Sequence, residues 1–315
     1  MTIGLDLGSH QFRSMRVVAD RLVARCCPAV FAMISDTPAH RRLLQQSETR
    51  FATCSDQLLV FGEAAREWSA MLNLSLTPLL HEGHLPASDP ISRQVLTLMI
   101  DAILPTPTLQ GTLCKMTLPG GGFDERIDHR DAEFFQQLVS LRGYRPQIMT
   151  ATHALALAEL NEAGFTGITV SLGHSTCEFG IIHCGREVVR CVVMGGLERF
   201  EGSLMLGSSE ACDEKVAVSV ERDYRRFFSD VIAEARVQFE LDGTLKTLPR
   251  SMPVVCSGGI TATPMFLPLF QRAWNEANWP VETQSIRVAS DSHLAVVRGC
   301  LIQTVLEQPV QTEAA

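Results

Sequence analysis

The sequence predicts an α/β protein made of two similar halves, in which strands and helices alternate along the chain. A hairpin with a Gly-Ser turn opens the 315-residue chain, and a similar hairpin at 170–179 opens its second half. In each half the hairpin leads into a mixed β/α segment that ends in a helix. Two equivalent β/α halves facing a cleft, each presenting a turn, suit a ligand that carries several phosphates.

The composition excludes several classes of protein. A net charge of −8 argues against nucleic acid as the main partner. The ten cysteines are scattered without the spacing of a zinc site, so we expect free thiols in a reducing compartment. The chain opens on a strand and not on a signal peptide, and no apolar run reaches the roughly 20 residues that span a bilayer. These features predict a soluble, cytoplasmic protein that does not insert into membranes.

The first turn is the candidate ligand site that the residues alone indicate. Asp6 lies in a short apolar strand, and Gly8, Ser9 and His10 follow it before a second apolar run at 15–18. Backbone N–H groups in such a turn attract an anion such as phosphate, and a nearby carboxylate can hold a hydrated magnesium ion. An ordinary hairpin with an incidental Asp explains the same residues, so the interpretation depends on the rest of the chain.

The remaining elements of the first half follow from apolar periodicity and from Gly and Pro punctuation. They are, in order, a polar loop or short helix at 36–49, a strand and helix start at 58–68, a loop at 76–90, a helix at 91–104, a strand at 113–118, a flexible turn at 119–122, a helix at 131–141, a short strand at 148–149 and a helix at 153–163 closed by Gly164.

The second half shows the same alternation. Its expected elements are three strands at 167–171, 178–183 and 187–194, a long amphipathic helix from 220, a buried strand at 253–256, a helix at 264–274, a strand at 286–288, a helix at 294–306 and a polar, disordered tail from 308.

Four segments in this order resemble the actin, heat-shock-chaperone and sugar-kinase superfamily, and most closely its bacterial MreB/FtsA branch. They are 4–9 and 171–176, similar to its two phosphate loops, 256–264, similar to its adenosine loop, and 293–300, similar to its closing helix. Supporting matches are the Gly-Glu-x-Ala segment at 62–65, the Ala-rich interdomain helix at 154–158 and the Gly-Gly turn at 195–201. Their order and spacing cover nearly the whole chain.

The resemblance implies an actin-like ATPase fold with two mixed five-stranded sheets flanked by helices around a cleft. It implies domain I at 1–149 plus 289–307, domain II at 150–288 and a tail at 308–315, with reduced small subdomains. ATP or ADP with magnesium is the implied cofactor, and an empty cleft is the alternative. The implied nucleotide contacts are Asp6, Gly8, Ser9, His10, Gly173, His174, Ser175, Thr176, Gly258, Gly259 and Ile260, with Asp6 also holding magnesium through water.

The chain departs from the hydrolysing members of that superfamily at the catalytic positions. Ser171 stands where the second phosphate loop begins with a metal-holding Asp, and His174 narrows that loop. Thr152 and His153 stand where a Glu or Gln orients the attacking water. They are the weak catalytic candidates beside Asp6, although a helix-capping Thr152 followed by a packed His153 is the favoured interpretation. Arg298 on the last helix is expected to form an ion pair.

We therefore expect an actin-like, MreB-like protein that is at most a weak ATPase, a pseudo-ATPase that acts through protein partners in a larger assembly, with self-association left open. The alternative is an active ATP-dependent cytoskeletal filament subunit or a chaperone-like reactivating ATPase. A sugar or acetate kinase is disfavoured because no catalytic acid stands near the interdomain helix.

Overall fold

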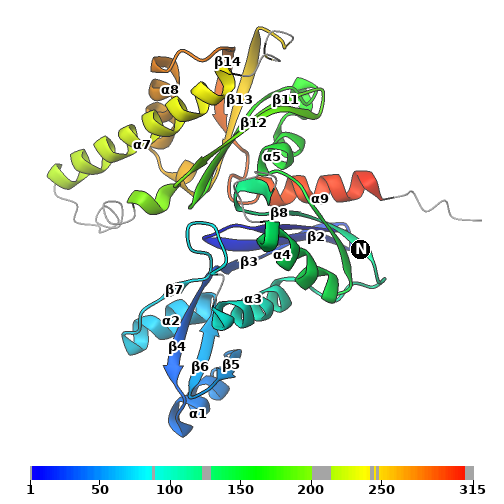
Figure 1. The fold of residues 1–315 in the computed structure, drawn as a ribbon, viewed down its shortest axis with the longest axis vertical. Helices are drawn as coiled ribbons and strands as arrows, with labels where there is room; N and C mark the ends of the chain where they lie inside the picture. Colours follow the sequence, from blue (N-terminus) through cyan, green and yellow to red (C-terminus); the bar gives the residue numbers. More distant parts are fainter. Residues whose placement is uncertain are drawn as a thin grey trace, which may run out of the picture. The chain divides into compact units, whose positions relative to one another are not determined.

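Two five-stranded sheets with the same strand order form the centres of two units of the computed structural model (Figure 1). The structure describes residues 2–86, 89–122, 129–200, 214–241, 245 and 248–308. The first unit spans Met1–Ile148 and Glu307–Ala315, and the second spans Met149–Leu306. The predicted fold class, mixed sheets flanked by helices, is confirmed.

The two sheets are mixed and match strand for strand. The first runs β3 (Arg21–Pro28), β2 (Gln11–Val18), β1 (Ile3–Leu7), β8 (Thr112–Thr117) and β9 (Tyr144–Ile148). The second runs β12 (Arg186–Met194), β11 (Thr176–His183), β10 (Gly167–Leu172), β13 (Ser251–Ser257) and β14 (Glu282–Val288). In each, an antiparallel hairpin is followed by parallel strands.

Two helices, α3 (Pro90–Ile103) and α4 (His129–Leu141), pack on the first sheet. Helix α3 begins where the sequence predicts, because the Asp89 carboxylate accepts from the Ile91 amide at 2.9 Å and Pro90 fits the first helical position. Its apolar stripe, with Val95, Met99 and Ile103 all buried, then faces the sheet.

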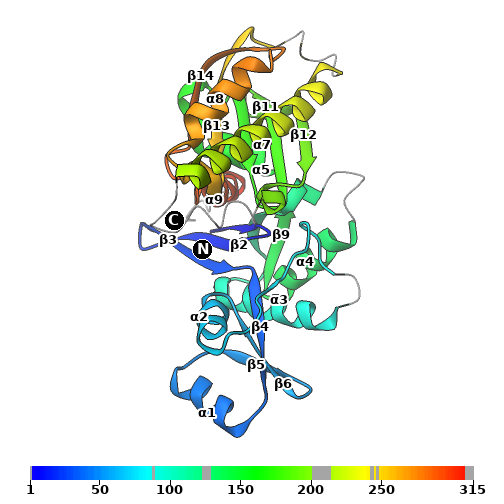
Figure 2. The same cartoon turned by 90° about the vertical axis from the view of Figure 1, so that its left-hand side faces the viewer.

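Between β3 and α3 the first unit carries an insertion with a core of its own (Figure 2). Its elements are β4 (Val30–Ser35), α1 (Pro38–Gln46), β5 (Phe51–Cys54), β6 (Gln57–Phe61), α2 (Glu63–Leu72) and β7 (Thr77–Pro78). Strand β6, α2 and the short helix α1 agree with the sequence. Strands β3, β4, β5 and β7 were not predicted. Strand β4 follows β3 after Ala29 alone, so no loop separates these two strands.

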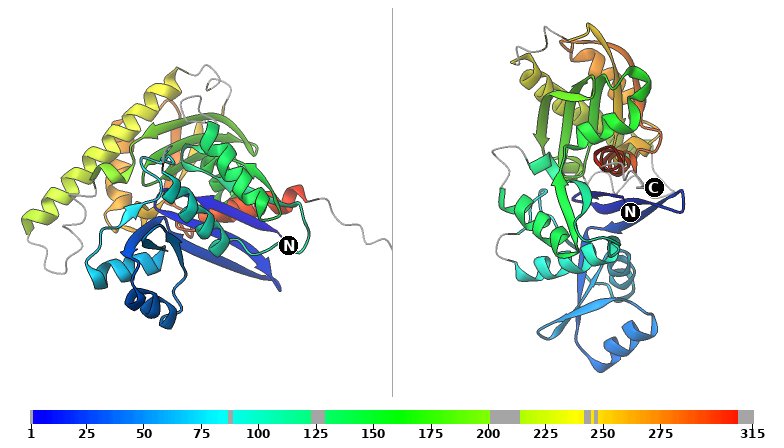
Figure 3. Two further views of the ribbon diagram at one scale, coloured as in Figure 1. Left: turned by 60° about the horizontal axis from the view of Figure 1, so that its bottom comes forward. Right: turned by 90° about the vertical axis from the view of Figure 1, so that its right-hand side faces the viewer.

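In the second unit, helices cover both faces of the sheet. On one face lie α7 (Glu214–Glu240) and α8 (Phe266–Glu276) (Figure 2). Aromatic side chains of both helices belong to the core of this unit. On the other lie α5 (Ala151–Glu159) and α9 (Ala295–Glu307). Helix α7 begins earlier than predicted and projects beyond the sheet it covers (Figure 3). Because side chains alternate along a strand, Ile168 and Val170 face α7 and α8 while Thr169 and Ser171 face the other way.

Helix α9 differs from the sequence-based division, which placed 289–307 in the first domain. Up to Leu306 it groups with the second unit. The reason is a close helix crossing: a Cβ on Gly299 would stand 1.8 Å from the carbonyl oxygen of Ala154 on α5. Of the predicted disordered tail, residues 309–315 lie outside the described part of the chain.

Candidate functional site

The first predicted phosphate turn joins β1 to β2 and holds Asp6 in a closed set of contacts. Asp6 Oδ2 accepts from Arg13 Nη1 at 2.9 Å, and Asp6 Oδ1 accepts from Thr117 Oγ1 at 2.8 Å. The Asp6 side chain is 14 % exposed and that of Arg13 is 16 % exposed. Each oxygen of the acid therefore already has a partner from its own unit.

The Arg13 guanidinium lies beneath the turn itself. Arg13 is the antiparallel partner of Asp6 in the β1–β2 pairing, so both side chains project from one face of the sheet. A Cβ built on Gly8 would lie 3.9 Å from Arg13 Nη1. Arg13 Nε is buried and makes no hydrogen bond within the described residues. The sequence places a cation at this spacing, but only the pairing register shows that it meets Asp6.

The other predicted residues of the first turn lie together. Gly8 and Ser9 form the tip with His10, and Ser9 is buried whereas His10 is exposed. The His10 carbonyl accepts from the Ala29 amide at 2.9 Å, which fixes the turn against β3 and β4. The His10 ring stands 3.4 Å from an Arg66 nitrogen of α2.

The second predicted turn, Gly173 to Ser175, is held by the Gly-Gly turn after β12. The amides of Gly195 and Gly196 each donate to the Ser175 carbonyl at 2.8 Å. The buried Ser175 hydroxyl donates to Glu198 Oε2 at 2.7 Å, and the Glu198 amide donates to the His174 carbonyl at 3.0 Å. Two segments that resembled separate motifs therefore form one packed loop pair.

The adenosine-like loop meets the same end of β10. Gly258 has a φ of +120°, and a Cβ there would stand 2.0 Å from the Leu172 carbonyl oxygen, so no other residue fits. A Cβ on Gly259, in contrast, would meet nothing within 4 Å. Backbone at Gly259 is thus open to a ligand, while the Ile260 side chain belongs to the core of the second unit.

The structure supplies an acid that sequence reasoning missed. Glu178 on β11 is the antiparallel partner of Ser171, so its carboxylate projects from the same face of the sheet. It is 3 % exposed and accepts from Arg190 Nη2 at 3.1 Å. Next to Ser171 on the other side stands Ser257, whose buried hydroxyl makes no hydrogen bond within the described residues. The available signal was the spacing: Glu178 follows Ser171 as Arg13 follows Asp6.

The start of α5 corrects the predicted helix cap. Thr150, not Thr152, is the capping residue, and its hydroxyl accepts from the His153 amide at 3.1 Å. Thr152 is fully buried two residues further along and donates to Glu187, an acid from β12 that sequence reasoning also missed. His153 Nε2 donates to the Gly185 carbonyl at 3.1 Å, so the ring is packed as expected.

The ion pair expected of Arg298 is present, with Glu159 at the end of α5. Arg287 Nη1 also donates to Glu159 at 2.5 Å, and the Ser290 amide donates at 3.1 Å. Burial by itself raises the pKa of Glu159, but Arg287, Ser290 and Arg298 together outweigh it and hold that pKa below its usual value. This cluster fastens α5, β14 and α9 to one another.

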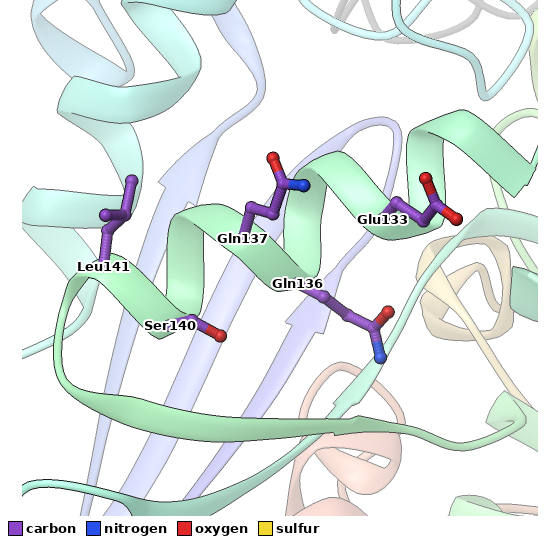
Figure 4. A pocket seen from close by; sticks show the side chains of 5 residues that line it. All are labelled: Glu133, Gln136, Gln137, Ser140 and Leu141. Atoms are coloured by element: carbon purple, nitrogen blue, oxygen red, sulfur yellow. The ribbon is translucent and has the colours of Figure 1, made fainter.

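An open hollow of about 550 Å³ lies along α4 in the first unit, away from the predicted residues (Figure 4). Its lining residues are Glu133, Gln136, Gln137, Ser140 and Leu141. All five residues lie along one face of α4, and Glu133 is the one ionisable residue among them. The hollow has none of the features of a catalytic site.

Magnesium in proteins is held by one or two carboxylates and keeps several waters, so it needs an acid with oxygens to offer. Each Asp6 oxygen accepts one hydrogen bond, from Arg13 or from Thr117, and a carboxylate oxygen can accept a second one. Asp6 can therefore still accept from a metal-bound water, and its predicted contact with magnesium through water stays a prediction. The described residues contain no group of three or more His, Cys, Asp or Glu side chains that could hold a metal ion directly.

Solved structures share this fold, which is that of the actin-like ATPases and their MreB-like branch. The MamK double helical filament has a TM-score of 0.64 at 13% identity, covering 98% of this chain and 99% of that one. MreB 5 of Spiroplasma citri bound to AMPPNP has a TM-score of 0.61 at 12% identity, covering 97% and 95%. The ethanolamine utilization protein EutJ from Carboxydothermus hydrogenoformans has a TM-score of 0.51 at 14% identity, covering 96% and 89%.

The family follows from the sequence itself. The Volactin family model matches residues 1–202, so the chain belongs to the Volactin family. No match was found among curated proteins. Within the described residues, no helix is long and apolar enough to cross a bilayer.

Proposed function

We propose that this protein is an actin-like, nucleotide-binding assembly protein that hydrolyses ATP slowly or not at all and acts by associating with proteins, first of all with copies of itself. The observation that carries the proposal is the start of α5, where the buried Thr152 hydroxyl donates to Glu187 at the position where the resemblance implies a water-orienting Glu or Gln. The scattered spacing of the ten cysteines along the sequence supports a reducing, cytoplasmic location.

Nucleotide binding is supported by the loops. Gly258 is required by its backbone conformation, and Gly259 leaves open backbone beside it. Gly8 and Ser9 in the first turn, and the second turn that the Gly173 amide closes by donating to the Thr176 carbonyl at 2.9 Å, are backbone arrangements of the kind that attract phosphate. MreB 5 of Spiroplasma citri and a non-polymerising mutant of MamK were solved with AMPPNP. We propose adenine nucleotide as the ligand of this chain by that similarity.

Slow turnover is supported by the chemistry of the catalytic positions. Phosphoryl transfer depends on charge neutralisation and on a group that orients the nucleophile. Ser171 is neutral, and the Thr152 hydroxyl is committed to Glu187. A buried hydroxyl that donates to a carboxylate in its own unit is poorly suited to orient water. The nucleotide would then act as a structural ligand and not as a substrate whose hydrolysis drives the protein.

Self-association is supported by the fold comparison alone. MamK is described as a double helical filament, and this chain spans nearly the whole of it. We propose that this chain forms polymers as well, and that nucleotide favours the polymerising conformation.

An active, switching ATPase is the second candidate, and one observation favours it. Glu178 lies opposite Ser171, and Glu187 contacts Thr152, so neighbouring strands bring carboxylates to both positions where the sequence lacks one. If these acids are released from Arg190 and Thr152 when nucleotide binds, they could carry the roles that the sequence has lost.

Sedimentation and phosphate release from ATP test the proposal on one preparation. We expect an ATP-dependent pellet and a phosphate release rate that Asp6→Ala leaves unchanged within error. Asp56→Asn, an exposed acid on a turn of the insertion, is the matched control. Phosphate release that Asp6→Ala abolishes and Asp56→Asn does not would establish the switching ATPase. Protein that stays in the supernatant with every nucleotide would overturn self-association.

A further inference from the structure

We propose that the outer edge of β3 is a docking site for an extended segment of another protein that carries residues in the order acidic, apolar, any, apolar, acidic. Such a segment would add to the first sheet as a further strand beside β3. The inference goes beyond the proposed function, because it requires neither nucleotide nor association between copies of this chain.

The first step is the exposure of β3. It is an outermost strand of the first sheet and, among the described residues, pairs with β2 alone (Figure 2). Residues 21–26 are exposed apart from the half-buried Val23. The outer edge of β3 therefore presents backbone N–H and C=O groups to which another strand can pair. The other edge strand of this sheet, β9, is shorter and carries Pro146, which lacks a backbone donor.

The second step is the cationic face of β3. Arg25 Nη1 donates to the carbonyl of Ala102 on α3 at 3.3 Å, so Arg25 projects from the face of the sheet on which α3 packs. Side chains alternate along a strand, so Arg21, four positions earlier, projects from the same face. Both arginines are exposed. An acid on a neighbouring strand could meet each of them.

The opposite face of β3 is apolar. Leu22 and Ala24 project from it, and Leu22 is the antiparallel partner of Val17 on β2. The Leu22 side chain is 60 % exposed and that of Val17 is 37 % exposed. Apolar side chains of an added strand would cover this face and remove both residues from water.

The third step is the local charge. The whole chain has a net charge of −8, but Asp20 is the one acid between Asp6 and Asp36. The same stretch carries four arginines, which are Arg13, Arg16, Arg21 and Arg25. A basic hairpin in an acidic protein favours an acidic partner.

These faces define the partner. Residues opposite each other on neighbouring strands project from one face, so acids belong opposite Arg21 and Arg25 and apolar residues belong opposite Leu22 and Ala24. The order is the same in either direction along the segment. A second copy of β3 would bring arginines to this edge in place of acids. A lipid surface binds apolar and cationic groups that lie on the same side, whereas β3 carries them on opposite faces.

Fluorescence anisotropy with two labelled peptides tests the inference on the full chain. The first peptide is Ser-Thr-Glu-Val-Thr-Val-Glu-Thr-Ser. The second exchanges its Glu and Val residues, so that composition and charge stay the same. We expect the first to bind about tenfold more tightly or better, because the second cannot place acids opposite both Arg21 and Arg25. Hydrogen exchange of the β3 amides should slow when the first peptide is bound.

Arg21→Glu combined with Arg25→Glu should weaken the first peptide about tenfold or more, and should bind a third peptide in which Lys replaces Glu. The matched control combines Arg42→Glu with Arg50→Glu, two exposed arginines of the insertion, and should leave binding unchanged. Thermal unfolding shows whether each variant is folded. The comparison of the first two peptides on the wild-type chain stands even if a variant does not fold.

Three results would overturn the inference. They are equal binding of the first two peptides, which would indicate charge attraction without strand register, no binding of either peptide, and binding to vesicles of phosphatidylserine and phosphatidylcholine by a chain that binds neither peptide. Each of them leaves the proposed function in place, because polymerisation and phosphate release are measured without these peptides.

Discussion

The two predicted phosphate turns lie at equivalent places in two sheets of the same topology, yet the strands that flank them carry different charged residues. In the first turn, Asp6 on the opening strand is paired across the hairpin with the cationic Arg13. In the second, the opening strand carries Ser171 and its register partner is the acid Glu178. Both acids end in an arginine pair, but Arg190 comes from a third strand. Both hairpins thus have the same pairing, but the acid lies on the first strand of one hairpin and on the second strand of the other.

This comparison shows that the sequence of one strand does not establish whether a site lacks a carboxylate. A register partner projects its side chain from the same face, so a neighbouring strand can restore a carboxylate that the motif lacks. It also shows that a retained acid can be paired within its own unit, because Asp6 accepts from Arg13 and from Thr117.

The largest effect is expected at the loop that packs on the second turn. Gly258→Ala should lower the free energy of unfolding by about 4 kcal/mol, because its Cβ would overlap the Leu172 carbonyl and its φ is unfavourable for alanine. Gly259→Ala, one residue on and in open space, should change it by less than about 1 kcal/mol. Chemical denaturation measures both. Equal costs at the two positions would mean that the loop does not pack on β10 in this way.

The ion pairs beneath the turns should differ in their contribution. Glu178→Gln should destabilise the protein by about 3 kcal/mol, because it leaves Arg190 buried without its counter-charge. Asp6→Asn should cost about 2 kcal/mol, because it also leaves Arg13 without its counter-charge, but Asp6 is more exposed than Glu178 and the amide oxygen can still accept from Thr117. A larger loss for Asp6→Asn than for Glu178→Gln in denaturant titrations would reverse the comparison.

The turn glycines offer a direct comparison at matching positions. Gly173→Ala should cost about 2 kcal/mol, because its Cβ would stand 2.6 Å from the Thr176 carbonyl oxygen. Gly8→Ala should cost about 1 kcal/mol, because the corresponding distance to the Gln11 carbonyl oxygen is 3.1 Å. Melting temperatures of the two variants rank them. An identical shift would indicate that both turns relax equally.

The smallest expected effect is a pH dependence from Glu159. Its pKa is lowered from 4.5 in the folded state, so its stabilising contribution is complete above that value and is lost as the pH falls through the lower, folded pKa. One proton limits the slope to about 1.4 kcal/mol per pH unit. Glu159→Gln should flatten the acid limb of stability against pH. An unchanged acid limb in that variant would assign the dependence to other carboxylates.

Local pattern was sufficient for much of the fold. Periodicity located α3 and α4, small-residue turns delimited β10 to β12, and glycines located the turns, because each signal lies within a few consecutive residues. The strand β4 was missed because it follows β3 after Ala29 alone. The packing of α9 on α5 is not visible in local pattern, because the Gly299 contact with Ala154 joins residues far apart in the chain.

For the candidate site, the sequence alone indicates which turns could receive a phosphate. Local backbone preferences set the arrangement of Asp6 with Gly8 and of Gly173 with Ser175, because the members of each pair lie close together in the chain. Only the tertiary structure decided what those turns can do. The contact between Asp6 and Thr117 joins residues 111 positions apart, and the pairing of Ser171 with Glu178 depends on strand register. The charge at a site depends on which side chains meet there, and that is fixed by how strands pair and pack rather than by the order of residues in one motif.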